Sequence, residues 1–321
     1  MSDGVLSVAK TMNTAHVFPG QGAQWVGMGR DLYGTFEAAK VVFKQADDSL
    51  GFPLSRLCFD GPEDELEQTI NAQPAILTAS YACLKAVGEV CGDNQFPPPA
   101  FVAGHSLGEY TALAAVGVLD FNDAVYLARE RGRLMHQAGL RQPGGMVAVI
   151  GLDEVSLAEV CYETGMQIAN INCPGQVVIS GNAENLTRAA DLAKSKGASR
   201  TILLKVSGAF HTPLMQPAVD GMSAVIAGLS FRPPLVPIIG NTTAEPLTTG
   251  EQVKAELLEQ LCKCVQWQRS VEYMVDKGVS SFVEIGPGRV LTGLIKRINR
   301  DAKLVNIGGT EAVRNLANPS P

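Results

Sequence analysis

Phe101-Val-Ala-Gly-His-Ser-Leu-Gly-Glu-Tyr110 is an apolar run that enters a Gly-x-Ser-x-Gly motif and leads into a helical pattern up to Val118. A serine in this setting lies on a sharp turn between a strand and a helix. Gly104 and Gly108 lack the Cβ atoms that would clash in such a turn. The turn exposes the Ser106 hydroxyl, and free N–H groups at the helix N-terminus can stabilise an oxyanion. The motif predicts an α/β fold with Ser106 as a candidate nucleophile.

The segment 142–206 has its own order of elements. The pattern predicts a strand at 146–150, a helix at 154–163, strands at 166–171 and 177–180, a helix at 183–196 and a strand at 201–206. This β-α-β-β-α-β order is typical of ferredoxin-like folds. We therefore expect a small ferredoxin-like subdomain inserted into a larger α/β-hydrolase-like subdomain with a parallel sheet, formed by residues 15–141 and 207–308. Residues 1–14 are expected to be a loose leader, and residues 309–321 a C-terminal tail.

The composition indicates a soluble globular enzyme. The chain has 321 residues, of which 46% are hydrophobic and 18% are charged, and we find no apolar run of about 18 residues that would suggest a membrane span. The first residues lack the pattern of a secretory signal, so a cytoplasmic location is expected. A formal charge of −6 disfavours broad binding to nucleic acid. The seven cysteines are scattered without zinc or redox spacing, which indicates reduced thiols and no metal site.

A serine nucleophile needs a base, and the sequence offers four histidines. His105 precedes Ser106 and should point to the other side of the turn, while His136 falls in a predicted helix and His16 in the first strand. His211 lies on a loop just after a predicted strand, where catalytic groups gather in α/β folds. Elimination therefore favours His211 as the base.

The group that orients the base stays open at this point. A hydrolase of this type places an Asp or Glu between the serine and the histidine in sequence. The acids in that interval fall on predicted helix surfaces, on loops or in the inserted subdomain: Asp120, Asp123, Asp153, Glu163 and Asp191. A backbone carbonyl could do the same work, which would give a dyad instead of a triad.

Several separated motifs together resemble those of the malonyl-CoA:acyl carrier protein transacylases and the acyltransferase domains of fatty acid and polyketide synthases. They occur in the family's order and cover nearly all of the chain after about residue 14. They are Val17-Phe-Pro-Gly-Gln-Gly-Ala-Gln24, Gly104-His-Ser-Leu-Gly-Glu-Tyr110, Arg129-Glu-Arg-Gly132, Asn172-Cys-Pro-Gly-Gln-Val-Val-Ile179, Ala209-Phe-His-Thr212, Val265-Gln-Trp267 and Glu284-Ile-Gly-Pro-Gly288.

The resemblance implies a role for each matching residue. Ser106 would carry the acyl group as an ester, and His211 would act as base and then as acid. Arg131 would pair with the free carboxylate of a malonyl group, which suits a planar guanidinium that stays charged. The remaining roles are the backbone N–H groups of Gln21 and Leu107 as oxyanion hole, the carbonyl of Gln266 as the group that orients His211, and Asn172 as a residue lining the site.

The resemblance also implies substrate and partners. Phe210 beside His211 leaves little room for an α-methyl group, so malonyl is expected over methylmalonyl; equal kcat/KM values for the two thioesters would contradict this. The reaction would be ping-pong transfer from malonyl-CoA to an acyl carrier protein, in a fatty acid or a polyketide pathway. We also expect a monomer that needs no cofactor. An acidic carrier would dock on a basic surface, formed by Arg289, Lys296, Arg297, Arg300 and Lys303 or by Lys194, Lys196 and Arg200.

Three alternative hypotheses for the function stay open. A serine hydrolase would use the same Ser106 and His211 but would need a triad acid and no Arg131. A binding module for carrier proteins would have no use for an activated nucleophile. An acyltransferase specific for an uncharged acyl group would have no use for Arg131.

Overall fold

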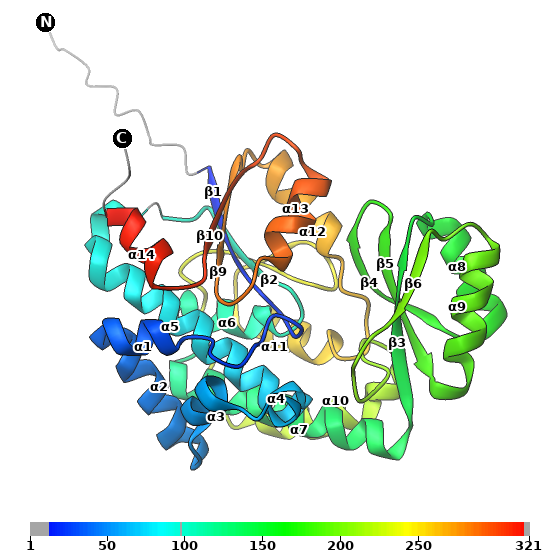
Figure 1. Ribbon diagram of the computed structural model, residues 1–321, viewed down its shortest axis with the longest axis horizontal. Coiled ribbons are helices and arrows are strands. Elements are labelled where there is room, and N and C mark those ends of the chain that lie inside the picture. The colour runs from blue at the N-terminus through cyan, green and yellow to red at the C-terminus, as the bar shows by residue number, and fades with distance from the viewer. Residues whose placement is uncertain (1–12, 97, 318–321) are drawn as a thin grey trace, which may run out of the picture.

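The computed structural model describes residues 13–96 and 98–317 and contains two sheets (Figure 1). The larger sheet has the strand order β10-β9-β1-β2-β7-β8. Its neighbouring strands are parallel, except that β8 runs antiparallel to β7. The strands are β1 (Thr14–Phe18), β2 (Phe101–Gly104), β7 (Ile238–Ile239), β8 (Pro246–Leu247), β9 (Ser281–Ile285) and β10 (Lys303–Ile307). A mixed α/β fold with a mainly parallel sheet was predicted and is confirmed.

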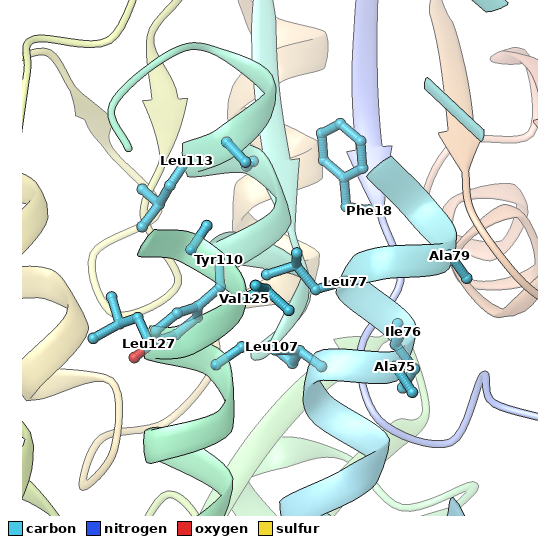
Figure 2. Close-up of a cluster of buried hydrophobic side chains, with 14 of the residues drawn as sticks. Phe18, Ala75, Ile76, Leu77, Ala79, Leu107, Tyr110, Leu113, Val125 and Leu127 are labelled. Carbon is cyan, nitrogen blue, oxygen red and sulfur yellow. The ribbon is translucent and has the colours of Figure 1, made fainter. Parts of the chain in front are cut away.

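Helices cover both faces of this sheet. Successive strand residues point to opposite faces, so Val17 lies in one apolar cluster and its neighbour Phe18 in another. The cluster of Val17 includes α12 (Trp267–Asp276) and α13 (Val290–Ile298). The cluster of Phe18 includes α5 (Thr69–Gln95), α6 (Gly108–Ala115) and α7 (Phe121–Arg141), whose side chains meet in Figure 2. The sheet is therefore buried on both sides, as parallel sheets require.

The other helices of the large unit lie around this core. They are α1 (Arg30–Thr35), α2 (Glu37–Leu50), α3 (Leu54–Asp60), α4 (Glu63–Glu67), α10 (Gln216–Ala227), α11 (Gly250–Glu259) and α14 (Thr310–Ala317). Of these, α2 packs against both α5 and α7, and α10 packs against α7.

Helix α5 corrects one expectation about composition. Over Thr69–Gly92 it is long and apolar enough to cross a membrane, although the sequence was expected to hold no such run. In the structure 61% of its most apolar window is buried, and the helix packs against α2, α6, α7 and α14. A helix that is apolar on most sides is also what the core of a large globular domain needs.

The smaller sheet is antiparallel and has the order β4-β5-β3-β6. Its elements follow one another as β3 (Gly144–Ile150), α8 (Glu154–Thr164), β4 (Gln167–Cys173), β5 (Gln176–Asn182), α9 (Leu186–Ser195) and β6 (Arg200–Leu203). Apolar residues on one face, such as Val147 and Ile179, pack with α8 and α9. Met146, Ala148 and Val178 on the opposite face belong to the large core cluster. The predicted order of elements is present, and β6 is shorter than expected.

A short backbone bridge joins the small sheet to the large unit. The N–H of Ile171 donates to the carbonyl of Val265 at 2.9 Å, and the N–H of Val265 donates to the carbonyl of Ala169 at 2.9 Å. Strand β4 is thereby tied to the segment that leads into α12.

The C-terminal residues differ from the expected tail. Residues 310–317 form α14, which packs on α5 and buries Val313 completely. The last four residues, and residues 1–12 of the predicted leader, lie outside the described residues. The first strand begins at Thr14, one residue earlier than expected.

Candidate active site

Ser106 lies on a tight turn between β2 and α6, as the sequence predicts. Its φ angle is 50°, in the left-handed region that non-glycine residues seldom adopt. A Cβ on Gly104 would lie 1.9 Å from the carbonyl carbon of Gly108, and a Cβ on Gly108 would lie 2.0 Å from the carbonyl oxygen of Phe18. Both contacts are to backbone, which cannot rotate away. The turn therefore requires glycine at both positions.

Replacement of Gly108 by alanine is expected to destabilise the protein by about 3 kcal/mol or more, because the new methyl group has no space. Thermal unfolding of the variant would show this as a lower Tm. Gly88→Ala is the control, since Gly88 is exposed in α5 and a Cβ there meets no atom within 4 Å. Equal Tm values for the two variants would contradict the steric account.

Ser106 and His211 meet although 105 residues separate them. The Ser106 Oγ lies 2.8 Å from the His211 Nε2. His211 follows β6 on a loop, has a φ of 60° and is 4% exposed. Thr212 stabilises this loop, because its hydroxyl donates to the carbonyl of Ala209 at 2.7 Å. The predicted serine–histidine pair is thus present as a hydrogen-bonded contact.

The carbonyl that orients His211 is that of Gln260, and the predicted Gln266 is wrong. The His211 Nδ1 lies 2.7 Å from the Gln260 carbonyl oxygen. The Gln266 carbonyl instead accepts the N–H of Ser270 at 2.9 Å in the first turn of α12. Within residues 13–96 and 98–317, no carboxylate forms a hydrogen bond with His211. The dyad is therefore the arrangement observed, and the candidate triad acids do not contact the histidine.

The surroundings of His211 keep its imidazole neutral. Burial, followed by the positive charge of Arg131, lowers the pKa of His211 to about 3, while the bond to Gln260 acts in the opposite direction. Nδ1 donates its hydrogen to the carbonyl of Gln260, so Nε2 is left as the acceptor that faces the Ser106 hydroxyl. This is the tautomer that a general base requires.

Arg131 comes from α7 and is 1% exposed. Its Nη1 donates to the Gln73 Oε1 at 2.8 Å, and its Nη2 donates to the Gln260 Oε1 at 2.7 Å and to the Ser106 Oγ at 3.1 Å. Its guanidinium lies 5.1 Å from the centre of the Tyr110 ring. None of the described carboxylates forms an ion pair with it, and its buried Nε has no hydrogen-bond partner. A buried cation held only by neutral groups can still accept an anion.

Two backbone N–H groups near Ser106 stay free for an oxyanion. Throughout the described chain, neither Gln21 nor Leu107 donates a backbone hydrogen bond. The Gln21 side chain is held by Thr69 Oγ1 at 3.1 Å. Gly20 lets this segment approach the nucleophile turn, since a Cβ on it would lie 2.3 Å from the carbonyl oxygen of His105.

A cavity of about 470 Å³ connects these groups. Most of the predicted site residues line it, namely Gln21, Ser106, Arg131, Asn172, Phe210 and His211, whereas Leu107 and Gln266 do not. His105 also lines it, but its Nε2 lies 2.8 Å from the Asn172 Oδ1, so it is not the base of Ser106. Met146, Ala148 and Val178 from the small sheet form an apolar wall. The cavity therefore combines a nucleophile, a base and a cation of the large unit with an apolar wall from the small sheet.

Sequence reasoning missed four residues around the site. Asn241 clamps the nucleophile turn: its Oδ1 accepts the N–H of Ser106 at 2.7 Å, and its Nδ2 donates to the carbonyl of Gly104 at 2.7 Å. It follows β7 directly after Gly240, and polar residues at the carboxyl ends of parallel strands are a usable signal. The other three are Gln73, Glu109 and Gln260.

Comparison with known proteins agrees with this geometry. Residues 15–311 match the family model of the acyl transferase domain. The malonyl CoA-acyl carrier protein transacylase of Bacillus subtilis is 44% identical over 304 residues, which is 93% of this chain and 94% of that protein. The transacylase of Escherichia coli K12 is 43% identical over 288 residues, 88% of this chain and 92% of that protein.

Solved structures of malonyltransferases are also similar to this chain. The acyl-carrier-protein-S-malonyltransferase of Bartonella henselae superposes with a TM-score of 0.90 at 42% identity and covers 94% of this chain and 97% of that one. The malonyl-transacylase of a type II polyketide synthase was solved in complex with its holo acyl carrier protein. It has a TM-score of 0.91 at 39% identity, and the match covers 96% of this chain and 100% of that one. With the family model matching nearly its whole length and these relatives above 38% identity, the chain belongs to the acyl transferase family.

Proposed function

We propose that this protein transfers a malonyl group from malonyl-CoA to the phosphopantetheine thiol of an acyl carrier protein through a malonyl ester of Ser106. The observation that carries the proposal is that one serine oxygen lies 2.8 Å from a neutral imidazole and 3.1 Å from a buried guanidinium. The imidazole makes the oxygen a nucleophile, and the guanidinium selects an acyl group that ends in a carboxylate. The similar transacylases support the same substrate.

The first half-reaction loads the enzyme. The malonyl carboxylate pairs with Arg131, and His211 Nε2 takes the proton of Ser106 as the oxygen attacks the thioester carbon. The N–H groups of Gln21 and Leu107 stabilise the tetrahedral oxyanion. The carbon–sulfur bond breaks, the histidine returns its proton to the leaving thiolate, and CoA departs as the free thiol.

The second half-reaction repeats these steps in reverse. The thiol of the carrier's phosphopantetheine arm gives its proton to His211 and attacks the ester carbon. The same N–H groups hold the second oxyanion. The carbon–oxygen bond then breaks, and Ser106 regains its proton from the histidine. No step of the proposed reaction calls for a metal or a bound cofactor, and every group comes from one chain, so we propose a monomer.

Intact-mass analysis tests the proposal against hydrolysis. The enzyme mixed with malonyl-CoA alone is expected to gain one malonyl adduct that persists until a holo carrier protein is added. A hydrolase would instead release malonate continuously and show no stable adduct. Acetyl-CoA is the matched donor, since it lacks only the carboxylate, and it should load far more slowly. Continuous malonate release, or equal loading from the two donors, would overturn the proposal.

The pH dependence of loading should follow the low pKa of His211, which stands at about 3 against an ordinary 6.5. Because kcat/KM reports groups of the free enzyme, its value for acetyl-CoA, which has no carboxylate to pair with Arg131, is expected to stay level from about pH 8 down to about pH 5. Only the neutral form of His211 can act as the base. Because its pKa is lowered, His211 stays neutral, and the enzyme stays active, to a lower pH. A fall in kcat/KM with a midpoint near the ordinary pKa of histidine would contradict this expectation.

We place the carrier protein on the basic cluster of Arg289, Lys296, Arg297, Arg300 and Lys303. All five side chains are exposed, and none forms an ion pair within the part of the chain that the structure describes. Helix α13 carries part of the cluster, and its Val290, Leu291 and Leu294 line the active-site cavity. A carrier bound there would have its arm near the entrance to Ser106.

The alternative basic cluster is weaker. Lys196 pairs with Glu159 at 2.9 Å and with Glu163 at 3.1 Å. Lys194 lies 3.7 Å from Asp191. Acidic neighbours on the same unit thus offset these charges, and an acidic partner would have to compete with them.

Charge reversal tests the docking surface. The double variant Lys296→Glu with Arg297→Glu is expected to raise KM for the carrier by about 10-fold or more at low salt, with a smaller effect at high salt. KM for malonyl-CoA loading should change little. The same double reversal at Lys194 and Lys196 is the control. An unchanged carrier KM at all salt concentrations would remove the proposed surface.

We also propose the finer fold assignment. The order β4-β5-β3-β6 with α8 and α9 on one face supports a ferredoxin-like type for the small unit, with boundaries near residues 142–206. The nucleophile turn between a parallel strand and a helix supports an α/β-hydrolase-like type for the large unit.

A further inference from the structure

Gln260 contacts the serine, the histidine and the arginine of the candidate site. Its backbone carbonyl accepts from His211, and its side-chain oxygen accepts from Arg131 Nη2 at 2.7 Å. Its side-chain Nε2 donates to the Ser106 carbonyl at 3.1 Å and to Glu109 Oε2. Gln260 is fully buried, so water cannot replace any of these partners.

Glu109 fixes which way the Gln260 amide faces. Glu109 is fully buried, and its Oε1 accepts the backbone N–H of Asn241 at 3.2 Å. A carboxylate offers only acceptors, so the amide must turn its NH₂ group toward Glu109. The amide oxygen is then left to face Arg131. The Ser106 carbonyl, which is also an acceptor, favours the same orientation.

The opposite orientation of the amide would be unfavourable at each of its contacts. The NH₂ group of Gln260 would face the Nη2 donor of Arg131, and its oxygen would face the carboxylate of Glu109. Both clashes would be buried, where unsatisfied polar groups are most costly. The acceptor-only group at position 109, together with the Ser106 carbonyl, therefore sets the direction of these hydrogen bonds.

We propose that Glu109 is a positioning residue that acts through Gln260 to hold Arg131 for a carboxylate-bearing acyl group. This inference rests on the proposed function, because it assigns Arg131 to the malonyl carboxylate. Glu109 itself forms no contact with the cavity, since it is absent from the residues that line it. Its effect is thus on the orientation of the guanidinium and not on the reacting atoms.

The contacts of Glu109 decide its charge state. Burial, and then the nearby Glu256 carboxylate, raise the pKa of Glu109 well above its ordinary value, against the opposing effect of the bonds from Gln260 and Asn241 and of the charge of Arg131. A proton on either oxygen would point at an N–H donor, because both oxygens already accept one. The observed contacts therefore fit the carboxylate form.

Glu109→Gln is the direct test, because it keeps size and shape and replaces one acceptor by a donor. The new amide can accept from Asn241 only by turning its NH₂ group toward Gln260, which drives the Gln260 amide to reverse. We expect kcat/KM for loading from malonyl-CoA to fall about 10- to 100-fold, mainly through KM, as one hydrogen bond to a charged group is lost. Loading from acetyl-CoA should change less than about threefold, because it does not use Arg131.

Glu256→Gln is the matched control. Glu256 is also buried and lies in the same region, but its oxygens accept from the N–H and the hydroxyl of Thr242. The Thr242 hydroxyl can rotate to accept from a new amide, so this variant should keep the ratio of malonyl to acetyl loading. Intact-mass measurement after rapid quenching gives both rates for each protein.

Gln260→Met decides the question if Glu109→Gln does not fold. It keeps the volume and the backbone carbonyl that His211 needs, but it removes the amide that holds Arg131. Loading from malonyl-CoA is expected to fall more than loading from acetyl-CoA, which itself changes because the amide also bonds the Ser106 carbonyl. Suppose that the wild type loads malonyl, but that Glu109→Gln, or Gln260→Met in its place, lowers the loading rates from malonyl-CoA and acetyl-CoA by equal factors. The positioning role is then overturned, while the proposed function stands. If the wild type loads no malonyl, the proposed function fails and this inference with it.

Discussion

Replacement of Ser106 by alanine is expected to abolish the malonyl adduct and to lower the transfer rate by a factor on the order of 10⁴ or more. The variant removes the hydroxyl oxygen that carries the acyl group in the proposed reaction, while the imidazole, the guanidinium and the free N–H groups remain. The measurement is intact mass after exposure to malonyl-CoA, together with turnover in the presence of a holo carrier protein. The His211→Ala variant should lower the rate of each half-reaction by a similar factor, because the hydroxyl is then left without a base.

A neighbouring serine supplies the control for this prediction. Ser207 is exposed on the loop before His211, and its hydroxyl lies 3.4 Å from that of Thr69. Ser207→Ala should load malonyl at nearly the wild-type rate. A persistent adduct on Ser106→Ala would place the nucleophile elsewhere and would defeat the proposed mechanism.

Replacement of Arg131 by alanine is expected to lower kcat/KM for malonyl-CoA by about 100- to 1,000-fold, the usual loss when one partner of a buried charge pair is removed. The physical reason is that, among the described residues that line the cavity, the only other lysine or arginine is Lys205, whose side chain is exposed. Loading from acetyl-CoA should hold or rise, because the variant no longer buries an unpaired charge beside the acyl group. Parallel kinetics with the two donors measure the change in preference.

Arg133 provides the matched control on the same helix. Its guanidinium pairs with Glu130 at 2.6 Å and is partly exposed. Arg133→Ala should therefore leave the preference for malonyl unchanged. Arg131→Lys should fall between the wild type and the alanine variant, because an ammonium keeps the charge but loses the planar fork. Equal losses with both donors in Arg131→Ala would indicate a structural effect instead of carboxylate recognition.

The nucleophile turn could be predicted because its cause is local. Gly104 and Gly108 stand four residues apart, and the backbone contacts that exclude a Cβ at each are made within the turn or with the adjacent strand. His211 could be reached by elimination, because the chain has only four histidines. The β-α-β-β-α-β order of the small unit followed from alternating periodicity, which depends on burial of one face at a time.

The group that orients the histidine could not be reached in the same way. Gln260 and Gln266 are both glutamines in one short segment, and every residue offers a backbone carbonyl. The choice depends on where α11 ends and α12 begins, since α12 uses the Gln266 carbonyl in its own first turn. Gln73 had no signal either, because a polar residue inside a long helix is ordinarily assigned to its surface.

The amino-acid sequence by itself determined the serine turn, the alternation of strands and helices, and the chemical groups available for acyl transfer. These features depend on neighbouring residues, on periodicity or on the small number of candidates. Only the tertiary structure decided which side chains share the cavity, which carbonyl holds His211, and how Glu109 reaches Arg131 through Gln260. Contacts of this kind join residues between 49 and 151 positions apart, and their geometry is set by the packing of whole helices against the two sheets.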